Sequence, residues 1–371
     1  MVVHRFGPRV TKSIALMLLI AGALLMGQAH YRAHAQEHDL LLYGMVLVGF
    51  SGPGIQLCGI HMSNLFPEST ALVACFIVGG LQLSFLIFTL FDLAYVHLGM
   101  SMATIFELYA AILLLTLVGT LLTEPDKPFE AKLKTEHELL SPMRLPSGLK
   151  DETPLLLTTP ELNMYRRNQR FAADEGLFCS DLRNHSFKTQ VLSKPFLLII
   201  FYFSILSLWC NFFVGSITGL LRWKGFTESE VASLLAKLAF VLPGSVVFIP
   251  LTGYLLEKCG YTNSSLLCTL VALCSTVMLS SKSPGWIVAG FVTHAFFRTL
   301  MFPLLFAYLG HRFGFQHYGA LSGIAFCIGG IVGLLQTPIA SIGDFQTIGY
   351  VQFGSLLLTF IMPYYERQRR N

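Results

Sequence analysis

Ten stretches of predominantly apolar residues run through the chain, and polar segments separate them. Each stretch is close to the ~20 apolar residues that an α-helix needs to cross the hydrocarbon core of a membrane. We therefore predict an all-α membrane protein. The predicted spans are residues 12–29, 40–63, 70–92, 100–122, 195–221, 229–252, 264–281, 285–309, 319–340 and 345–363.

The longest polar segment divides these spans into two groups. Residues 123–194 are rich in Lys, Glu, Pro and Thr and have no sustained apolar period, so we interpret them as a long loop. Residues 1–122 would then form a partial N-terminal bundle of four helices. Residues 195–371 would form a C-terminal bundle of six helices with a short cytoplasmic tail.

Basic residues predict how the helices are oriented in the membrane. With the first residues in the cytoplasm, the short inner segments carry eight Lys and Arg residues and the outer segments carry four. The loop 123–194 adds eleven more on the inner side, in agreement with the positive-inside rule. A cleaved signal peptide over the first span is the alternative that we considered. We expect the plasma membrane or an endosomal or vacuolar membrane.

The composition narrows the classes of function. Charged residues make up 12% of the chain, about half the share in soluble domains, and mean hydropathy is +0.62. The net charge of +4 requires no nucleic-acid partner, because the basic excess lies on one side of the membrane. The eight cysteines lack C-x-x-C spacing, so we expect no metal site and no cofactor. We also find no paired acid–base residues or nucleophile motif, so we expect no catalytic residues and no enzyme activity.

A short motif occurs twice, each time before a predicted helix on the cytoplasmic side. An offset of 253 residues (260 − 7) aligns Gly260 with Gly7 and carries the helices after one copy onto those after the other. The glycines permit a tight turn, and the charged residues can favour one conformational state. We predict a cytoplasmic gating motif made of Arg5, Gly7 and Arg9 in the first copy and of Gly253, Glu257, Lys258 and Gly260 in the second. We interpret a further His-Arg-Phe-Gly at 311–314 as a coincidence.

The two copies differ in what precedes them. Two predicted helices lie between the loop and the second copy, whereas no helix precedes the first copy. We therefore expect an N-terminally truncated chain that lacks the first two of twelve helices. The alternative that this raises is a transport-inactive scaffold or regulatory membrane protein.

Two further stretches, together with the motif, carry a family resemblance. They are GFSGPGIQLCGIHMSNLFP (49–67) and YLGHRFGFQHYGALSGIAFCIGGIVGLLQ (308–336). The chain resembles the major facilitator superfamily and, more narrowly, the solute carrier 43 group of large-neutral-amino-acid transporters. The resemblance implies a major facilitator fold and transport by alternating access, with a small-molecule solute and the lipid bilayer as partners. Large neutral amino acids are the implied substrates, ahead of nucleobases and cationic amino acids. His4 stands where the family motif usually has Asp.

By this resemblance, spans 40–63, 195–221 and 285–309 line the central cavity. Small and polar residues recur at helical spacing in 40–63, where we expect Gln56 to contact substrate. Gly52, Pro53 and Gly54 predict a helix break that exposes backbone carbonyls to substrate. Close helix packing through small residues is the alternative interpretation of this stripe.

A similar polar stripe follows span 195–221. It contains Ser204, Ser207 and Asn211 at helical spacing. We expect Asn211 to contact substrate. Gly215 and Gly219 form a G-x-x-x-G pattern, so helix packing is again the alternative.

Span 285–309 contains a charge within the membrane. Arg298 is predicted to lie past the midplane, where a charged residue costs at least ~2.5 kcal/mol. His294 lies one turn earlier on the same face, and Pro303 predicts a second helix break. The guanidinium suits a substrate carboxylate, and structural pairing or snorkelling to the interface are the alternatives. No Asp or Glu lies deep on a predicted cavity helix, which favours facilitated uniport or exchange over proton coupling.

Overall fold

The structure is a computed structural model that describes residues 2–31, 38–66, 70–127, 129, 182–183, 185–314 and 316–370. Nearly all of these residues are helical, and the described ranges contain no β-strand. The prediction of an all-α membrane protein is therefore confirmed. Most of the predicted loop 123–194 lies outside the described residues.

The first group of predicted spans forms four long helices. Gly7 breaks the first of them, with φ 79° and ψ 168°, so its membrane-crossing part begins at Pro8. Proline suits this position because the first helical N–H has no partner within the helix. The elements are α1 (Val2–Tyr31), α2 (His38–Ile60), the short 3-10 helix η1 (His61–Leu65), α3 (Thr70–Leu98) and α4 (Met102–Thr123).

The second group of spans forms the remaining elements. Several helices begin at a residue whose side chain caps the first backbone N–H groups, such as Thr227 and Asp344. The elements are α7 (Phe187–Val191), α8 (Lys194–Trp223), α9 (Glu228–Gly244), η2 (Ser245–Phe248), α10 (Ile249–Ser280), α11 (Pro284–Phe313), α12 (Tyr318–Gly333), α13 (Gln336–Ala340), α14 (Phe345–Leu358) and α15 (Ile361–Arg370).

Nine helical stretches of the described chain are long and apolar enough to cross a membrane. One of them, Glu228–Ser280, has 53 residues and would be about 80 Å long as a straight helix, against about 30 Å of hydrocarbon. Gly260 interrupts it with φ 73° and ψ 170°. This stretch therefore provides two crossings, and each of the ten predicted spans has a counterpart in the structure.

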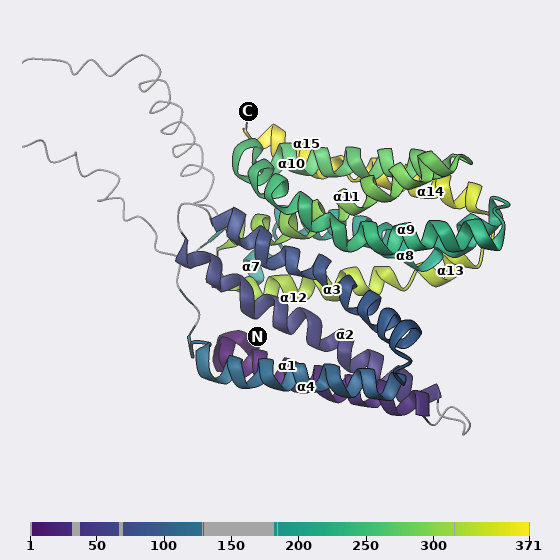
Figure 1. The fold of residues 1–371 in the computed structure, drawn as a ribbon. Coiled ribbons are helices and arrows are strands. Elements are labelled where there is room, and N and C mark those ends of the chain that lie inside the picture. The colour runs from purple at the N-terminus through teal and green to yellow at the C-terminus, as the bar shows by residue number, and fades with distance from the viewer. Residues whose placement is uncertain are drawn as a thin grey trace, which may run out of the picture.

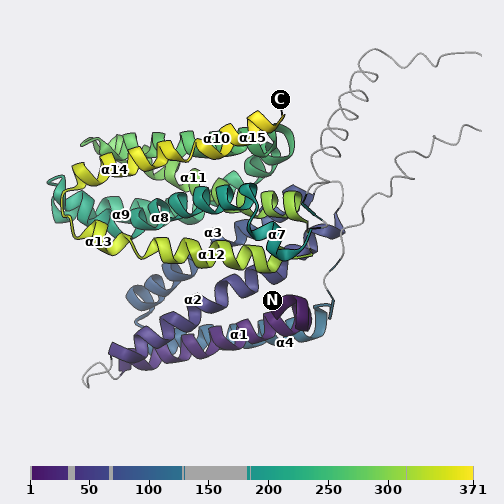
Figure 2. The ribbon, with the colours of Figure 1, turned by 180° about the vertical axis from the view of Figure 1, so that it is seen from behind.

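The helices form two groups with α3 between them. Figures 1 and 2 show α1, α2 and α4 side by side, apart from the elements α8 to α15. Although α3 belongs to the first half of the sequence, it packs along α9, α10 and α11 of the second half. At Gly79, for example, an added methyl group would come within 2.1 Å of the Ile249 side chain. The interface between the two halves is therefore largely a contact of α3.

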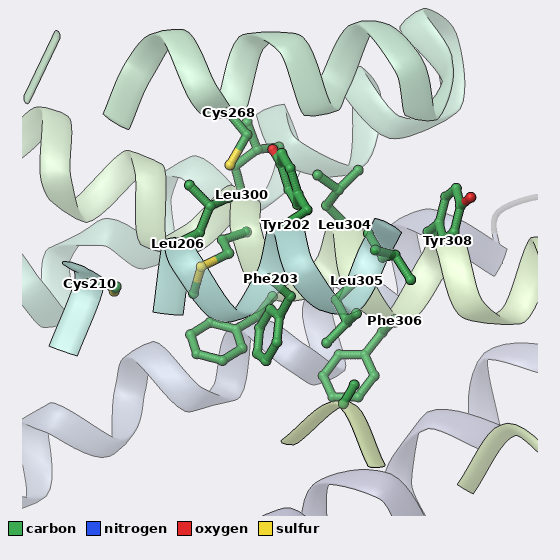
Figure 3. Close-up of a cluster of buried hydrophobic side chains, with 14 of the residues drawn as sticks. Tyr202, Phe203, Leu206, Cys210, Cys268, Leu300, Leu304, Leu305, Phe306 and Tyr308 are labelled. Carbon is green, nitrogen blue, oxygen red and sulfur yellow. The ribbon is translucent and has the colours of Figure 1, made fainter. Parts of the chain in front are cut away.

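The main hydrophobic core lies in the second half, around α8 and α11. Tyr202, Leu206 and Leu300 are each at most 1% exposed. In the most apolar stretch of α11, 72% is buried inside the protein. A polar side chain at the centre of this helix therefore faces other helices rather than lipid. Figure 3 shows the part of this core formed by Tyr202, Phe203, Leu206, Cys210, Cys268, Leu300, Leu304, Leu305, Phe306 and Tyr308.

The structure corrects the two predicted helix breaks. The helix α2 is continuous through Gly52, Pro53 and Gly54, and α11 is continuous through Pro303. A proline keeps a helical φ and removes one N–H···O=C bond, and the small glycine neighbours in α2 leave room for the ring. These prolines therefore free single carbonyls without ending the helix.

Candidate functional site

Arg298 lies at the centre of α11. It is 14 positions after Pro284 (298 − 284) and 15 before Phe313 (313 − 298), so each end of the helix is about 21 Å away. The side chain is only 9% exposed, so other helices enclose it.

The guanidinium of Arg298 contacts aromatic rings and no carboxylate. Its central carbon lies 4.4 Å from the ring centroid of Phe85 and 5.8 Å from that of Phe302. The thiol of Cys210 on α8 also interacts with it. Nε is buried and has no hydrogen-bond partner, and no acid among the described residues forms a salt bridge with Arg298. The Nε of this arginine therefore keeps donor capacity at the centre of α11.

His294 joins Arg298 as predicted, one helical turn away and 4% exposed. Its ring centroid lies 4.0 Å from that of Phe213, and its Nε2 lies 3.9 Å from the sulfur of Cys210. The imidazole is thus packed on an aromatic ring beside the arginine. Three phenylalanines, each from a different helix, surround this pair with apolar rings: Phe85, Phe213 and Phe302.

Asn211 does not join this pair. It is exposed, and its Nδ2 donates to Ser207 Oγ on the same helix at 3.3 Å. Cys210, its neighbour in the chain, points toward His294, and consecutive residues on a helix point about 100° apart. Trp209 on the other side of Cys210 donates to Ser355 Oγ at 2.6 Å.

Gln56 lies between α2 and α3 rather than beside Arg298. Its Nε2 donates to the backbone oxygen of Ile77 at 3.4 Å. The glycine stripe on the same helix is open at Gly49 and Gly52, where an added methyl group would meet no atom within 4 Å, and closely packed only at Gly59, where it would come within 3.2 Å of the Ile77 side chain. Close contacts with α1 lie at Gly44, whose added methyl group would come within 3.0 Å of the backbone oxygen of Gly22, and at Gly54, where it would come within 3.0 Å of Ala15.

The first copy of the predicted gating motif binds the end of α4. Arg9 donates from Nε to the backbone oxygen of Glu124 at 2.6 Å and pairs with Asp126 at 2.8 Å. Lys12 pairs with the buried carboxylate of Glu124. A methyl group at Gly7 would come within 1.9 Å of the backbone oxygen of Asp126, so only glycine fits there. Arg5 lies in α1, but its side chain is outside the described part of the structure.

The second copy binds α3, in the other half of the molecule. Glu257 Oε1 accepts a hydrogen bond from the backbone N–H of Leu72 at 3.1 Å. A methyl group at Gly253 would come within 2.5 Å of the Leu72 side chain, whereas Lys258 is exposed. The motif therefore links the two halves at their predicted cytoplasmic ends.

The backbone supports the alignment of the two copies. Gly7 and Gly260 have nearly identical dihedral angles, with φ 79° and 73° and ψ 168° and 170°. Gly314, at the end of the His-Arg-Phe-Gly sequence that we interpreted as a coincidence, has φ 72° and ψ −177°. This third sequence ends α11 with the same backbone turn.

Sequence reasoning missed the residues of α3 that complete these contacts. Leu72 and Phe85 are ordinary apolar residues of a membrane span, and nothing in the sequence marks them as partners of Glu257 and Arg298. Gln82 is also missed: it is 2% exposed, and its Oε1 has no hydrogen-bond partner. The signal that could have found it is an amide within an otherwise apolar run.

Comparisons with known proteins agree with this architecture. The family described as Major Facilitator Superfamily matches residues 1–335. The chain is similar to Protein FMP42 of Saccharomyces cerevisiae, with 22% identity over 371 residues that cover 90% of this chain and 72% of that protein. The ten membrane crossings, the repeated turn and the match along most of the chain lead to one conclusion: this multi-pass membrane protein belongs to the major facilitator superfamily, whose members transport small solutes.

Proposed function

We propose that this protein carries large neutral amino acids across a membrane by alternating access, as a facilitated uniporter or exchanger. The observation that carries the proposal is Arg298, a buried arginine with an unpartnered Nε at mid-depth. We assign to it the carboxylate of the substrate. The plasma membrane or an endosomal or vacuolar membrane is the proposed location.

The cost of burying a charge supports a ligand for Arg298. A charge at the centre of a membrane helix costs about 2.5–3.5 kcal/mol even on insertion scales. Aromatic rings recover part of this cost, but Nε at the edge of the guanidinium still has no acceptor. A carboxylate fits that edge and forms parallel charge-assisted hydrogen bonds.

The surroundings of Arg298 fit a substrate with a large apolar side chain. Phe85, Phe213 and Phe302 lie around Arg298 and His294, and each comes from a different helix. A binding site of this kind combines apolar walls with a few polar groups that fix the ligand's orientation. Leucine, isoleucine and phenylalanine have this combination of an apolar side chain and a carboxylate.

The contacts between the two halves support alternating access. Glu257 holds the start of α3 at the predicted cytoplasmic ends, and Phe85 on the same helix contacts Arg298 at mid-depth. Opening a path to the cytoplasm requires these contacts of α3 to loosen. A gate and a substrate site that share one helix can be coupled through that helix.

The positions of the acidic residues support uncoupled transport. Within the described spans, Asp92 and Glu107 are exposed near the predicted outer ends, and Glu124 and Glu257 lie near the predicted cytoplasmic ends. None of the acids in the described residues lies at the depth of Arg298. A proton relay through a carboxylate at the substrate site is therefore not part of the proposal.

A second candidate substrate class is monocarboxylates with an apolar group. The observation that favours it is the same lack of an acid near Arg298 in the described residues, because an amino acid also carries an ammonium group. A carboxylate without an ammonium group would need only the arginine.

Exchange in proteoliposomes tests the proposal. We expect the purified protein to exchange radiolabelled phenylalanine and leucine. The variants Arg298→Lys and Arg298→Gln should weaken the apparent affinity for both amino acids at least tenfold. This is the effect of losing a hydrogen bond to a charged group, which contributes about 1.5–3 kcal/mol. Arg222→Gln is the matched control, because Arg222 is exposed and pairs with Glu228 at 2.8 Å.

Three outcomes would contradict this proposal in different ways. Unchanged affinity in Arg298→Lys would end the assignment of the carboxylate to Arg298. Exchange of 3-phenylpropionate but not of phenylalanine would favour the monocarboxylate class. A folded protein that neither binds nor exchanges solutes would favour the transport-inactive scaffold.

A further inference from the structure

We propose that Gln82 of α3 binds the ammonium group of an amino-acid substrate whose carboxylate is held by Arg298. This inference rests on the proposed function and names the second polar residue of the same site. It also decides between the two candidate substrate classes, because only amino acids have an ammonium group.

The buried amide of Gln82 has an acceptor that a ligand could satisfy. Its side chain is 2% exposed, and its Oε1 is buried without a hydrogen-bond partner. Buried polar groups in native proteins are nearly always hydrogen-bonded, and an unsatisfied one needs an explanation. Burying an amide in an apolar span without a partner is also unfavourable. A substrate that donates hydrogen bonds would supply the missing partner.

Gln82 and Arg298 lie at the same junction between helices. Gln82 is three positions before Phe85 on α3, which places the two on one helix face about 4.5 Å apart along the axis. The ring of Phe85 lies 4.4 Å from the guanidinium carbon of Arg298. The same face of α3 meets the second half one turn earlier, where Gly79 lies against Ile249. The junction of α3 and α11 therefore has an unpartnered acceptor and an unpartnered donor.

These two groups are complementary to an amino acid. The substrate's ammonium and carboxylate groups are attached to the same carbon atom, so they bind neighbouring partners. The amide oxygen of Gln82 accepts from the ammonium group, and the guanidinium of Arg298 donates to the carboxylate. A monocarboxylate would satisfy Arg298 and leave Gln82 without a partner.

Phe85 can remain in place when the substrate binds. Aromatic rings stack on the face of a guanidinium, whereas carboxylates bind at its N–H edge. The Nε without a partner belongs to that edge. Phe85 can therefore stabilise the charge and still leave the donors free for the carboxylate.

The test compares two ligands that differ in the ammonium group. Phenylalanine exchange and its inhibition by 3-phenylpropionate are measured in proteoliposomes that contain the full chain. We expect Gln82→Leu to raise the KM for phenylalanine about ten- to a hundredfold, the range for a lost hydrogen bond to a charged group. Inhibition by 3-phenylpropionate should be unchanged.

A matched control separates binding from folding. Gln190 is also fully buried and its Oε1 also has no hydrogen-bond partner, but it lies away from Arg298 and its Nε2 donates to the backbone oxygens of Leu182 and Phe313 at 2.7 and 3.1 Å. Gln190→Leu should lower thermal stability and leave the ratio of the two ligands' affinities unchanged. If Gln82→Leu fails to fold, Gln82→Met replaces it, because methionine is similar in length and adapts to its surroundings.

The outcomes distinguish this inference from the proposed function. Equal weakening of both ligands in Gln82→Leu, or no weakening of either, would overturn the assignment of Gln82 while leaving amino-acid transport intact. Wild-type protein that binds 3-phenylpropionate but not phenylalanine would overturn the proposed substrate class, and the inference with it.

Discussion

The carboxylate of Glu257 accepts a hydrogen bond from the backbone N–H of Leu72, with 3.1 Å between Oε1 and N. Glu257 belongs to α10 in the second half of the chain, and Leu72 lies in the first turn of α3 in the first half. The first N–H groups of a helix have no partner within it, and its N-terminus favours a negative charge. A motif of one half thus caps a helix of the other half.

Removal of this cap should open the predicted cytoplasmic side. We expect Glu257→Ala to increase the reaction of Cys75 with a membrane-permeant maleimide several-fold, because Cys75 lies on α3 one turn after Leu72 and is 1% exposed. The labelled site is identified by peptide mass spectrometry. Lys258→Ala, at an exposed neighbouring position, should leave the labelling unchanged. Equal labelling in Glu257→Ala and the wild type would show that this contact does not hold the two halves together.

The glycine at the first motif copy is needed for two separate reasons. Gly7 has a positive φ of 79°, and an added methyl group would also collide with the backbone of Asp126. Gly225 has φ 87° but open space around it, so it isolates the cost of a positive φ. We expect Gly225→Ala to cost about 1–2 kcal/mol and Gly7→Ala to cost more, measured by thermal unfolding in detergent. Equal losses in the two variants would argue against the collision at Asp126.

The sequence predicted the helices better than the contacts between them. Apolar runs of membrane length locate α8 and α11 because each must satisfy its own backbone hydrogen bonds in lipid. The end of α11 was predicted less well, because an apolar run does not mark the polar last turn that ends at Phe313. The sequence still singled out Arg298, because a charge within a membrane span is costly.

The partners of that arginine were not predictable in the same way. The contact between Phe85 and Arg298 joins residues that are 213 positions apart (298 − 85), and one of them is a phenylalanine among the 31 in the chain. Asn211 shares its helix face with Ser204 and Ser207, which are buried, yet Asn211 itself is exposed in the structure. Periodicity shows which residues share a face, and only packing shows what the face meets.

The buried pair of Lys12 and Glu124 should stabilise the first half. Glu124 is 1% exposed, and its other carboxylate oxygen has no partner, so loss of the lysine leaves an uncompensated charge. We expect Lys12→Met to cost about 3–5 kcal/mol, the usual cost of breaking a buried pair on one side. The double variant Lys12→Met with Glu124→Gln should recover part of that loss. Additive effects in this double-mutant cycle, measured by thermal unfolding, would rule out a coupled pair.

Lys224 should make stability depend on pH on the outer side. Burial and the neighbouring Lys282 lower the pKa of Lys224 to about 8, although its Nζ donates to the backbone oxygens of Leu279 and Ser281. We give burial more weight than these carbonyls, because they are neutral acceptors. Between pH 8 and the ordinary lysine pKa of about 10.5, the unfolded chain then binds more protons than the folded protein. The free energy of unfolding from this group therefore rises with pH across that window.

Replacement of Lys224 isolates this effect. Thermal unfolding of the wild type and of Lys224→Met is compared from pH 7 to 10, with Lys237→Met as an exposed-lysine control. We expect the difference in midpoint between the wild type and Lys224→Met to change with pH in favour of the wild type above pH 8, and the difference for the control to stay constant. A shift in the opposite direction would mean that the carbonyl contacts outweigh burial and raise the pKa of Lys224. The direction of the change with pH therefore shows whether burial or the carbonyl contacts control the pKa of Lys224, which lies where α8 meets the end of α10.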